Sequence, residues 1–189
     1  MVIALIGTSG GGKSYLLAQM LAVDPNYPKV LIGLTDDPSL RRFLRKQWQW
    51  IVLDRLITQA QLEAKDQVVV DLRPLTPQEA TWNLERLIQA VVDRRGGVVA
   101  IDEAHLFLTR PSPQIVRFIR GARHYRLKVY IATQRWVDIH PHIRAVVKHL
   151  FIFRTTSWRD IEALEKETGE DLRGQVARLG VGEYIYRRR

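Results

Sequence analysis

The chain has 189 residues, of which 46% are hydrophobic and 26% charged, with no cysteine and a formal net charge of +9. This composition predicts a single globular domain over residues 1–189 and excludes a disordered chain, a disulfide scaffold, a cysteine-ligated zinc finger and a thiol enzyme. No apolar run approaches the roughly 20 residues of a transmembrane helix and no signal-peptide pattern is visible, so we expect a soluble intracellular protein.

Short apolar runs recur along the chain and predict buried strands. Their hydrophobicity is continuous rather than alternating, which is typical of parallel strands that are covered on both faces. Residues 182–189 alternate instead, like an edge strand that is followed by a basic tail. The predicted buried strands are Val2–Ile6, Val30–Ile32, Val68–Val70, Val98–Ile101, Val129–Ala132 and Leu150–Phe153.

Stretches with helical spacing lie between these strands. Thr76 and Pro77 supply a cap and a first turn for the longest of them. Alternating strands and helices predict an α/β fold with a mostly parallel central sheet flanked by helices. Residues 35–66 are less regular, and we interpret them as an insertion or an extra helix pair. The predicted helices are Lys13–Leu21, Pro77–Asp93, Pro113–His124 and Trp158–Thr168.

A glycine-rich loop follows the first strand and opens the first helix. Its sequence fits the pattern G-x-x-x-x-G-K-[ST], in which glycines let backbone N–H groups converge on phosphate oxygens at a helix N-terminus. Lys13 is expected to reach the β and γ phosphates of ATP, and the Ser14 hydroxyl is expected to ligate Mg²⁺. The predicted nucleotide-binding residues are Gly7, Thr8, Ser9, Gly10, Gly11, Gly12, Lys13, Ser14 and Tyr15.

Two acidic residues end the strand Val98–Ile101 and supply the second part of this site. Asp102 is expected to hold the magnesium shell, as in a Walker B segment. Glu103 is then placed to polarise the attacking water. Uncompensated carboxylates at this buried edge of a sheet would be costly without a cation. His105 either packs locally or couples ATP to the substrate.

Gln134 follows the strand Val129–Ala132 at the sheet edge where open α/β sheets bind ligands. We expect its side chain to contact the γ-phosphate or the attacking water and to report hydrolysis to the rest of the fold.

The ordered set of these motifs resembles the HerA/FtsK superfamily of P-loop ATPases. The resemblance rests on Gly7–Ser14, Ile101–His105, Arg120–Leu127, Val129–Arg135 and the turn Asp138–Pro141. It implies a RecA-like fold of the additional-strand catalytic-glutamate division. The small members without membrane anchors are the genome-packaging ATPases of icosahedral viruses with internal membranes, and they are similar to this chain in size.

The resemblance also implies an assembly and its partners. The assembly is a homo-oligomeric ring, a hexamer or a pentamer, in which an arginine of one subunit completes the ATP site of its neighbour. Arg123 matches that position, with Arg120 and Arg126 as rivals and an ordinary basic helix face as the alternative. The implied partners are double-stranded DNA and a capsid-vertex or membrane protein. The implied location is the host cytoplasm or the packaging vertex of the virion.

The charge distribution fits a DNA partner. Residues 1–103 carry 12 basic and 12 acidic side chains, whereas residues 104–189 carry 17 basic and 8 acidic ones. This excess favours phosphate contacts, although a generally basic proteome would produce it too. The candidates for these contacts are Arg110, Arg144, Lys148 and 187–189. The alternative functions are a DEAH-like helicase, a phage assembly ATPase, a nucleotide switch and a small-molecule kinase.

Overall fold

The computed structural model describes residues 1–33, 49–52, 66–72 and 75–189. Within these residues, eight strands form one sheet in the order β3-β4-β2-β5-β6-β1-β7-β8. All neighbouring strands are parallel except β7 and β8, which are antiparallel. The strands are β1 (Val2–Ile6), β2 (Lys29–Ile32), β3 (Gln49–Val52), β4 (Gln67–Asp71), β5 (Gly97–Ile101), β6 (Leu127–Thr133), β7 (His149–Phe153) and β8 (Tyr184–Arg188). The predicted α/β fold with a mostly parallel sheet is confirmed.

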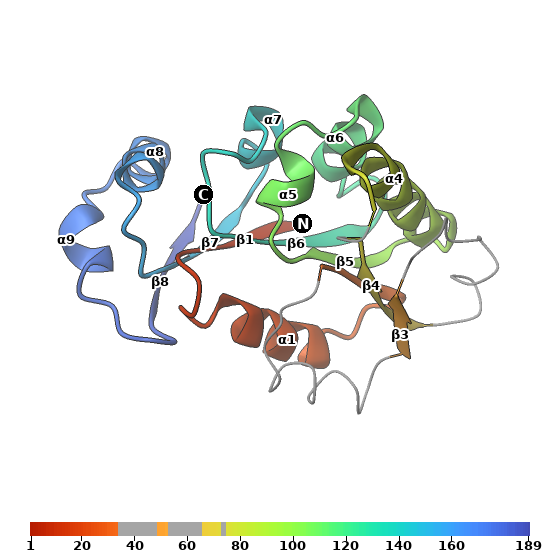
Figure 1. Cartoon of the computed structure of the whole chain (residues 1–189), viewed down its shortest axis with the longest axis horizontal. Coiled ribbons are helices and arrows are strands. Elements are labelled where there is room, and N and C mark those ends of the chain that lie inside the picture. Colours follow the sequence, from red (N-terminus) through yellow and green to blue (C-terminus); the bar gives the residue numbers. More distant parts are fainter. Residues whose placement is uncertain (34–48, 53–65, 73–74) are drawn as a thin grey trace.

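Helices cover both faces of this sheet (Figure 1). Helix α1 lies on one face, and α4 to α8 lie on the other. Each face has its own cluster of buried apolar side chains, and the strands contribute to both clusters because successive side chains of a strand point to opposite faces. The helices are α1 (Lys13–Val23), α4 (Pro77–Asp93), α5 (His105–Leu108), α6 (Pro113–Arg120), α7 (Pro141–Arg144), α8 (Trp158–Thr168) and α9 (Arg173–Val176).

Helix α4 shows how the local sequence sets these boundaries. The Thr76 hydroxyl accepts a hydrogen bond from the Glu79 N–H, and the Glu79 carboxylate accepts one from the Thr76 N–H at 2.9 Å. This capping box satisfies backbone donors that a helix N-terminus leaves free. Leu84, Leu87 and Ile88 then recur along one side and are buried against the sheet. The predicted bounds of this helix are confirmed.

The short helices α5, α7 and α9 were not predicted, and α6 and β3 differ from the prediction in ways that the structure explains. Helix α6 ends at Arg120 rather than at 124, because Gly121 caps the helix and the chain turns back so that the Leu127 N–H donates to the Ala122 carbonyl at 2.7 Å. The Tyr125 ring packs against Phe118 in this turn, with ring centroids 5.4 Å apart. Strand β3 lies inside the segment 35–66, for which we expected no strand. Most of that segment falls outside the described residues.

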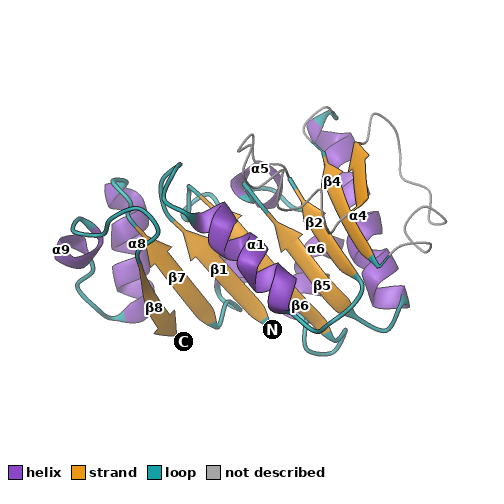
Figure 2. Ribbon diagram, turned by 90° about the horizontal axis from the view of Figure 1, so that it is seen from below, coloured by secondary structure: helices purple, strands orange, loops and turns teal. Residues whose placement is uncertain are grey.

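The sheet has two distinct edges along the direction of its strands. The parallel strands end together at one edge, called here the carboxyl edge, and begin together at the opposite, amino edge. The two ends of the chain lie on the amino edge, because β1 begins there and the antiparallel β8 ends there (Figure 2). Within the described residues, no helix has the length and apolar character needed to cross a bilayer.

Candidate active site

The loop between β1 and α1 presents unpaired backbone donors. Gly10 and Gly12 have φ angles of +72° and +98°, in the left-handed region that glycine adopts without a steric penalty. Within the described part of the chain, the backbone N–H groups of Gly12, Lys13 and Ser14 make no hydrogen bond. Free N–H groups at the beginning of a helix form an anion site, and the helix dipole adds to it. The loop is therefore built to hold phosphate.

Lys13 is the first residue of α1 and its side chain is buried, with 4% of the residue exposed. Its Nζ donates a hydrogen bond to the Thr8 carbonyl at 2.8 Å. Burial lowers the pKa of Lys13, and the negative charges of Glu103 and Asp102 act in the opposite direction. A buried ammonium is costly unless an anion compensates it, so a phosphate group in the loop would stabilise this side chain.

Asp102 directly follows β5, which β6 separates from β1, and its side chain reaches the loop. The Ser14 hydroxyl donates to Asp102 Oδ2 at 2.9 Å, and the Glu103 N–H donates to Asp102 Oδ1 at 3.0 Å. Burial raises the pKa of Asp102, and the hydrogen bond from Ser14 opposes that rise. A hydroxyl and a carboxylate oxygen at this distance are the kind of oxygen pair that a magnesium ion with bound phosphate uses.

The turn after β2 fixes the position of Asp102. The Asp102 N–H donates to the Ile32 carbonyl at 2.8 Å. Gly33 has a φ angle of +89°, and a Cβ atom there would lie 2.6 Å from the Asp102 carbonyl oxygen. Only glycine leaves enough space for this close approach of two backbone segments.

Glu103, Gln134 and His105 form a cluster next to Asp102. Gln134 Nε2 donates to Glu103 Oε1 at 2.7 Å, and His105 Nδ1 lies 3.5 Å from Glu103 Oε2. Among the described residues Glu103 Oε2 has no hydrogen-bond partner, because 3.5 Å is too long for a good one. Glu103 also has a φ angle of +48°, which is strained for a residue with a side chain and is common at functional sites. The cluster therefore holds a carboxylate with one oxygen still available.

Arg123 lies elsewhere. It is exposed on the turn between α6 and β6, and therefore at the amino edge, opposite the loop and Asp102. Arg120 and Arg126, the two rivals, lie at the same edge. Within the described residues the Arg123 guanidinium has no hydrogen-bond or ion-pair partner. The structure thus brings Lys13, Ser14, Asp102, Glu103 and Gln134 together but leaves Arg123 far from the site of its own chain.

Sequence reasoning missed two backbone contacts that hold the loop. The Arg154 carbonyl, just after β7, accepts hydrogen bonds from the Thr8 N–H at 2.9 Å and the Thr8 hydroxyl at 3.1 Å. The Gly182 N–H, just before β8, donates to the Gly11 carbonyl at 3.1 Å. No sequence motif marks Arg154 or Gly182. Gly182 reaches the loop because β8, which follows it, pairs with β7.

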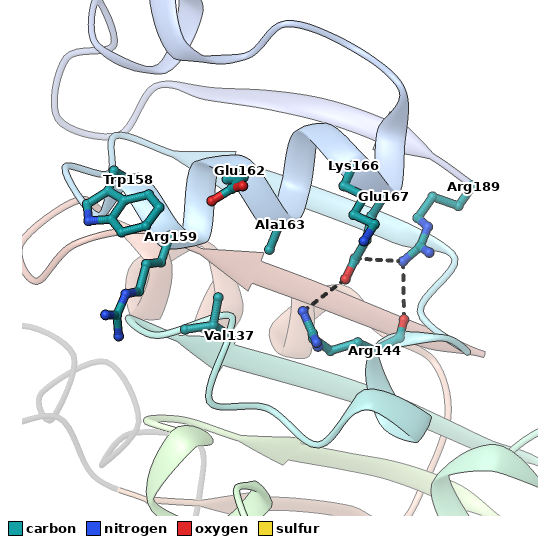
Figure 3. Close-up of a pocket in the computed structure, with 9 residues that line it drawn as sticks. All are labelled: Val137, Arg144, Trp158, Arg159, Glu162, Ala163, Lys166, Glu167 and Arg189. Carbon is teal, nitrogen blue, oxygen red and sulfur yellow. Dashed lines mark hydrogen bonds and ion pairs between the residues drawn. The ribbon is translucent and has the colours of Figure 1, made fainter.

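A separate pocket of about 770 Å³ lies along α8 and contains no residue of the phosphate loop. Figure 3 shows Arg144 and Arg189 pointing toward Glu167 from opposite sides. Both guanidinium groups lie 3.1 Å from the Glu167 carboxylate. The indole N–H of the buried Trp136 also donates to it. Two arginines share one carboxylate here, and the pocket contains none of Lys13, Ser14, Asp102, Glu103 and Gln134, so the candidate active site is the phosphate loop and not this pocket.

Comparison with known proteins places the chain in a family. The model of the AAA domain family matches residues 1–138, and no curated protein sequence matches the chain. The genome packaging NTPase B204 of Sulfolobus turreted icosahedral virus 2, solved with AMP, is 20% identical, with a TM-score of 0.76 over 99% of this chain and 92% of that chain. VirB4 of Thermoanaerobacter pseudethanolicus is 13% identical, with a TM-score of 0.72 over 98% and 86%. EssC (ATPases 2 and 3) of Geobacillus thermodenitrificans is 14% identical, with a TM-score of 0.65 over 98% and 37%. Similarity at these identities shows a shared fold, and the match over residues 1–138 shows that the chain belongs to the AAA domain family of P-loop ATPases.

Proposed function

We propose that this protein hydrolyses ATP to move double-stranded DNA, as the genome-packaging motor of a virus. The observation that carries the proposal is the convergence of Lys13, Ser14, Asp102, Glu103 and Gln134 at the carboxyl edge. The fold shared with B204, a genome packaging NTPase, supports DNA as the polymer that is moved. The expected partners are a second copy of the chain, DNA, and a capsid-vertex or membrane protein, either in the host cytoplasm or at the vertex.

The loop residues bind the nucleotide. Backbone N–H groups of Gly12 to Ser14 donate to phosphate oxygens, and the ammonium of Lys13 compensates their charge. The Ser14 hydroxyl and the Asp102 carboxylate would hold Mg²⁺, since both present oxygen atoms to the loop. When bound, Mg²⁺ neutralises charge on the β and γ phosphates.

Glu103 and Gln134 serve the hydrolytic step. Glu103 Oε1 is held by the Gln134 amide, so the free Oε2 can accept a hydrogen bond from the attacking water and polarise it. Gln134 belongs to the loop that follows β6, and its contact with Glu103 gives this loop a way to respond to hydrolysis.

Arg123 acts on a neighbouring subunit in this proposal. It lies at the amino edge of its own chain, so it can complete an ATP site only if a second copy presents its carboxyl edge to it. A guanidinium is permanently charged and planar, which suits the charge that develops on the transferred phosphoryl group. Head-to-tail contacts of this kind close into a ring, and we expect a pentamer or a hexamer.

The experiment that tests this proposal measures ATP hydrolysis with and without blunt duplex DNA. Wild type should hydrolyse ATP faster with duplex, and Lys13→Ala should be inactive, whereas the control Lys166→Ala on the exposed side of α8 should retain activity. Arg123→Ala should also be inactive alone. Mixing Lys13→Ala with Arg123→Ala should restore part of the activity, because some mixed interfaces contain an intact loop and an intact arginine. Full activity of Lys13→Ala contradicts the ATPase assignment, and full activity of Arg123→Ala contradicts its role across the interface.

A further inference from the structure

Helix α8 holds the glutamine loop, the name used here for residues 134–138, at two points. The indole N–H of Trp136 donates to Glu167 Oε2 at 3.1 Å, and the Val137 N–H donates to Asp160 Oδ1 at 2.8 Å. Both acceptors are carboxylates of α8, and they are about two helical turns, or about 10.5 Å, apart along it. The loop is therefore fixed to the helix at two separate places, which prevents it from rotating about a single contact.

The glutamine loop is also closed by hydrogen bonds of its own backbone. The Arg135 N–H donates to the Thr133 hydroxyl at 3.1 Å, and the Ile139 N–H donates to the Trp136 carbonyl at 3.1 Å. The side chains of Trp136 and Ile139 are fully buried. Because a closed and packed turn moves as one unit, a displacement at Trp136 also displaces Gln134.

The beginning of the loop contacts Glu103. The Ala104 N–H donates to the Ala132 carbonyl at 2.9 Å, which ties the backbone next to Glu103 to β6. The Glu103 side chain is held separately, through the Gln134 amide that donates to Oε1 at 2.7 Å. The position of the amide therefore sets where the second oxygen, Oε2, lies. A general base works only within hydrogen-bond reach of the proton that it accepts, so this position matters for hydrolysis.

Glu167 holds its end of the loop firmly because three donors share its carboxylate. Arg144 and Arg189 each lie 3.1 Å from it, and the third donor is the Trp136 indole. The two guanidinium groups approach it from opposite sides (Figure 3). Hydrogen bonds between charged groups are shorter and stronger than neutral ones. The carboxylate is thus immobilised, and it keeps the indole in one place.

Asp160 serves the loop from inside the protein. It is fully buried, and it lies in the first turn of α8, where the helix dipole offsets part of the cost of burying a negative charge. Its Oδ1 accepts the Val137 N–H, and Oδ2 has no hydrogen-bond partner among the described residues. A well-packed apolar side chain would stabilise a fold at least as well as a buried charge. The contact that distinguishes the carboxylate from such a side chain is its hydrogen bond to the glutamine loop.

We propose that Glu167 and Asp160 are positioning residues for ATP hydrolysis. They hold the glutamine loop so that the Gln134 amide keeps Glu103 Oε2 directed at the attacking water. This inference rests on the proposed role of Glu103 in hydrolysis, and it adds the part of the molecule that orients this side chain. A misplacement of about 1 Å at a reacting group can slow a reaction by about 100-fold, so contacts on α8 can control turnover without touching the nucleotide.

The test compares steady-state phosphate release and equilibrium ATP binding in wild type and Glu167→Gln. Glutamine keeps the size of the side chain but loses the charge that holds both guanidinium groups, so the contact with Trp136 is weakened. We expect kcat to fall by about 10- to 100-fold, while KM and the Kd for ATP stay within about twofold of wild type. Asp160→Asn should change the same quantities in the same direction. The matched control is Glu170→Gln, which breaks an ion pair of 2.6 Å with Arg187 outside the glutamine loop and should keep the wild-type kcat.

A double variant shows whether the effect passes through Gln134. Gln134→Ala alone should lower kcat. Addition of Glu167→Gln should then lower kcat by less than about twofold further, because the amide that Glu167 positions is already absent. Trp136→Phe removes the indole N–H and keeps an aromatic ring. It should lower kcat with the same dependence on Gln134, and it decides the question if Glu167→Gln does not fold in urea denaturation.

Other outcomes overturn the inference. A wild-type kcat in folded Glu167→Gln would show that the carboxylate only stabilises the fold. Full multiplication of the two losses in the double variant would show that Glu167 acts by a route other than Gln134. Loss of ATP binding together with turnover would show a general collapse of the site. In all three cases the proposed function stands as long as Glu103→Gln is inactive, whereas full turnover of Glu103→Gln contradicts the proposed function itself.

Discussion

Replacement of Glu103 by glutamine should separate nucleotide binding from turnover. The change removes one negative charge and keeps the size and the left-handed backbone of the residue, since glutamine and glutamate have similar conformational preferences at φ +48°. The Gln134 amide can still donate to the remaining oxygen, although a hydrogen bond to a neutral acceptor is about 1 kcal/mol weaker than one to a carboxylate. The free Oε2 that polarises water becomes an amide nitrogen.

The expected size of the effect depends on that geometry. Loss of a positioned general base slows a reaction by about 10²- to 10⁴-fold, which corresponds to about 2.7 to 5.5 kcal/mol in the activation barrier. The affinity for ATP should not fall together with the rate of hydrolysis. Glu103 has the same sign of charge as the triphosphate, so its neutralisation removes a repulsion and should leave the Kd for ATP unchanged or lower.

The assay combines steady-state phosphate release with equilibrium binding of a fluorescent ATP analogue. Glu162→Gln, an exposed carboxylate on α8, is the matched control and should behave as wild type in both. Two results refute the reasoning. One is a kcat of Glu103→Gln within about threefold of wild type, and the other is the loss of turnover together with nucleotide binding.

Three further predictions test the fold. Gly33→Ala puts a Cβ atom 2.6 Å from the Asp102 carbonyl at a φ of +89°, and should lower the free energy of unfolding by about 1 to 3 kcal/mol in urea denaturation. Burial and the charge of Arg188 lower the pKa of His149 in the folded protein, so the unfolded chain binds more protons. The free energy of unfolding should therefore fall as the pH decreases from 7 to 5. Arg188→Gln should raise the pKa of His149 in an NMR titration. Thr76→Ala removes the cap of α4 and should lower the free energy of unfolding by about 1 kcal/mol, again measured in urea.

The fold was largely predictable because it depends on local patterns. Continuous apolar runs such as Val98–Ile101 can only be buried on both faces, and the cap at Thr76 and Pro77 defines where α4 begins. The strand order could not be predicted in this way, because it depends on pairing between residues that are far apart in the sequence. Nothing in the sequence of β3 indicates that it lies at an edge beside β4. The early end of α6 arises from the cap at Gly121 and the turn that follows it, in which Tyr125 packs on Phe118, and helical spacing alone does not reveal it.

The candidate site also has a part that the sequence predicts and a part that depends on contacts between distant segments. Lys13, Asp102 and Gln134 follow strands at the same edge, so their meeting is a consequence of parallel topology. The contacts of Thr8 with Arg154 and of Gly11 with Gly182 depend on backbone atoms, which carry no sequence signal.

The central claim is that ATP hydrolysis moves this protein along duplex DNA, and a triplex-displacement assay tests it most directly. A third strand bound to a blunt duplex should be released by wild type in the presence of ATP, at a rate that depends on its distance from the DNA end. Glu103→Gln should bind the same duplex and release nothing. Robust ATP hydrolysis by wild type without any release of the third strand would contradict the account.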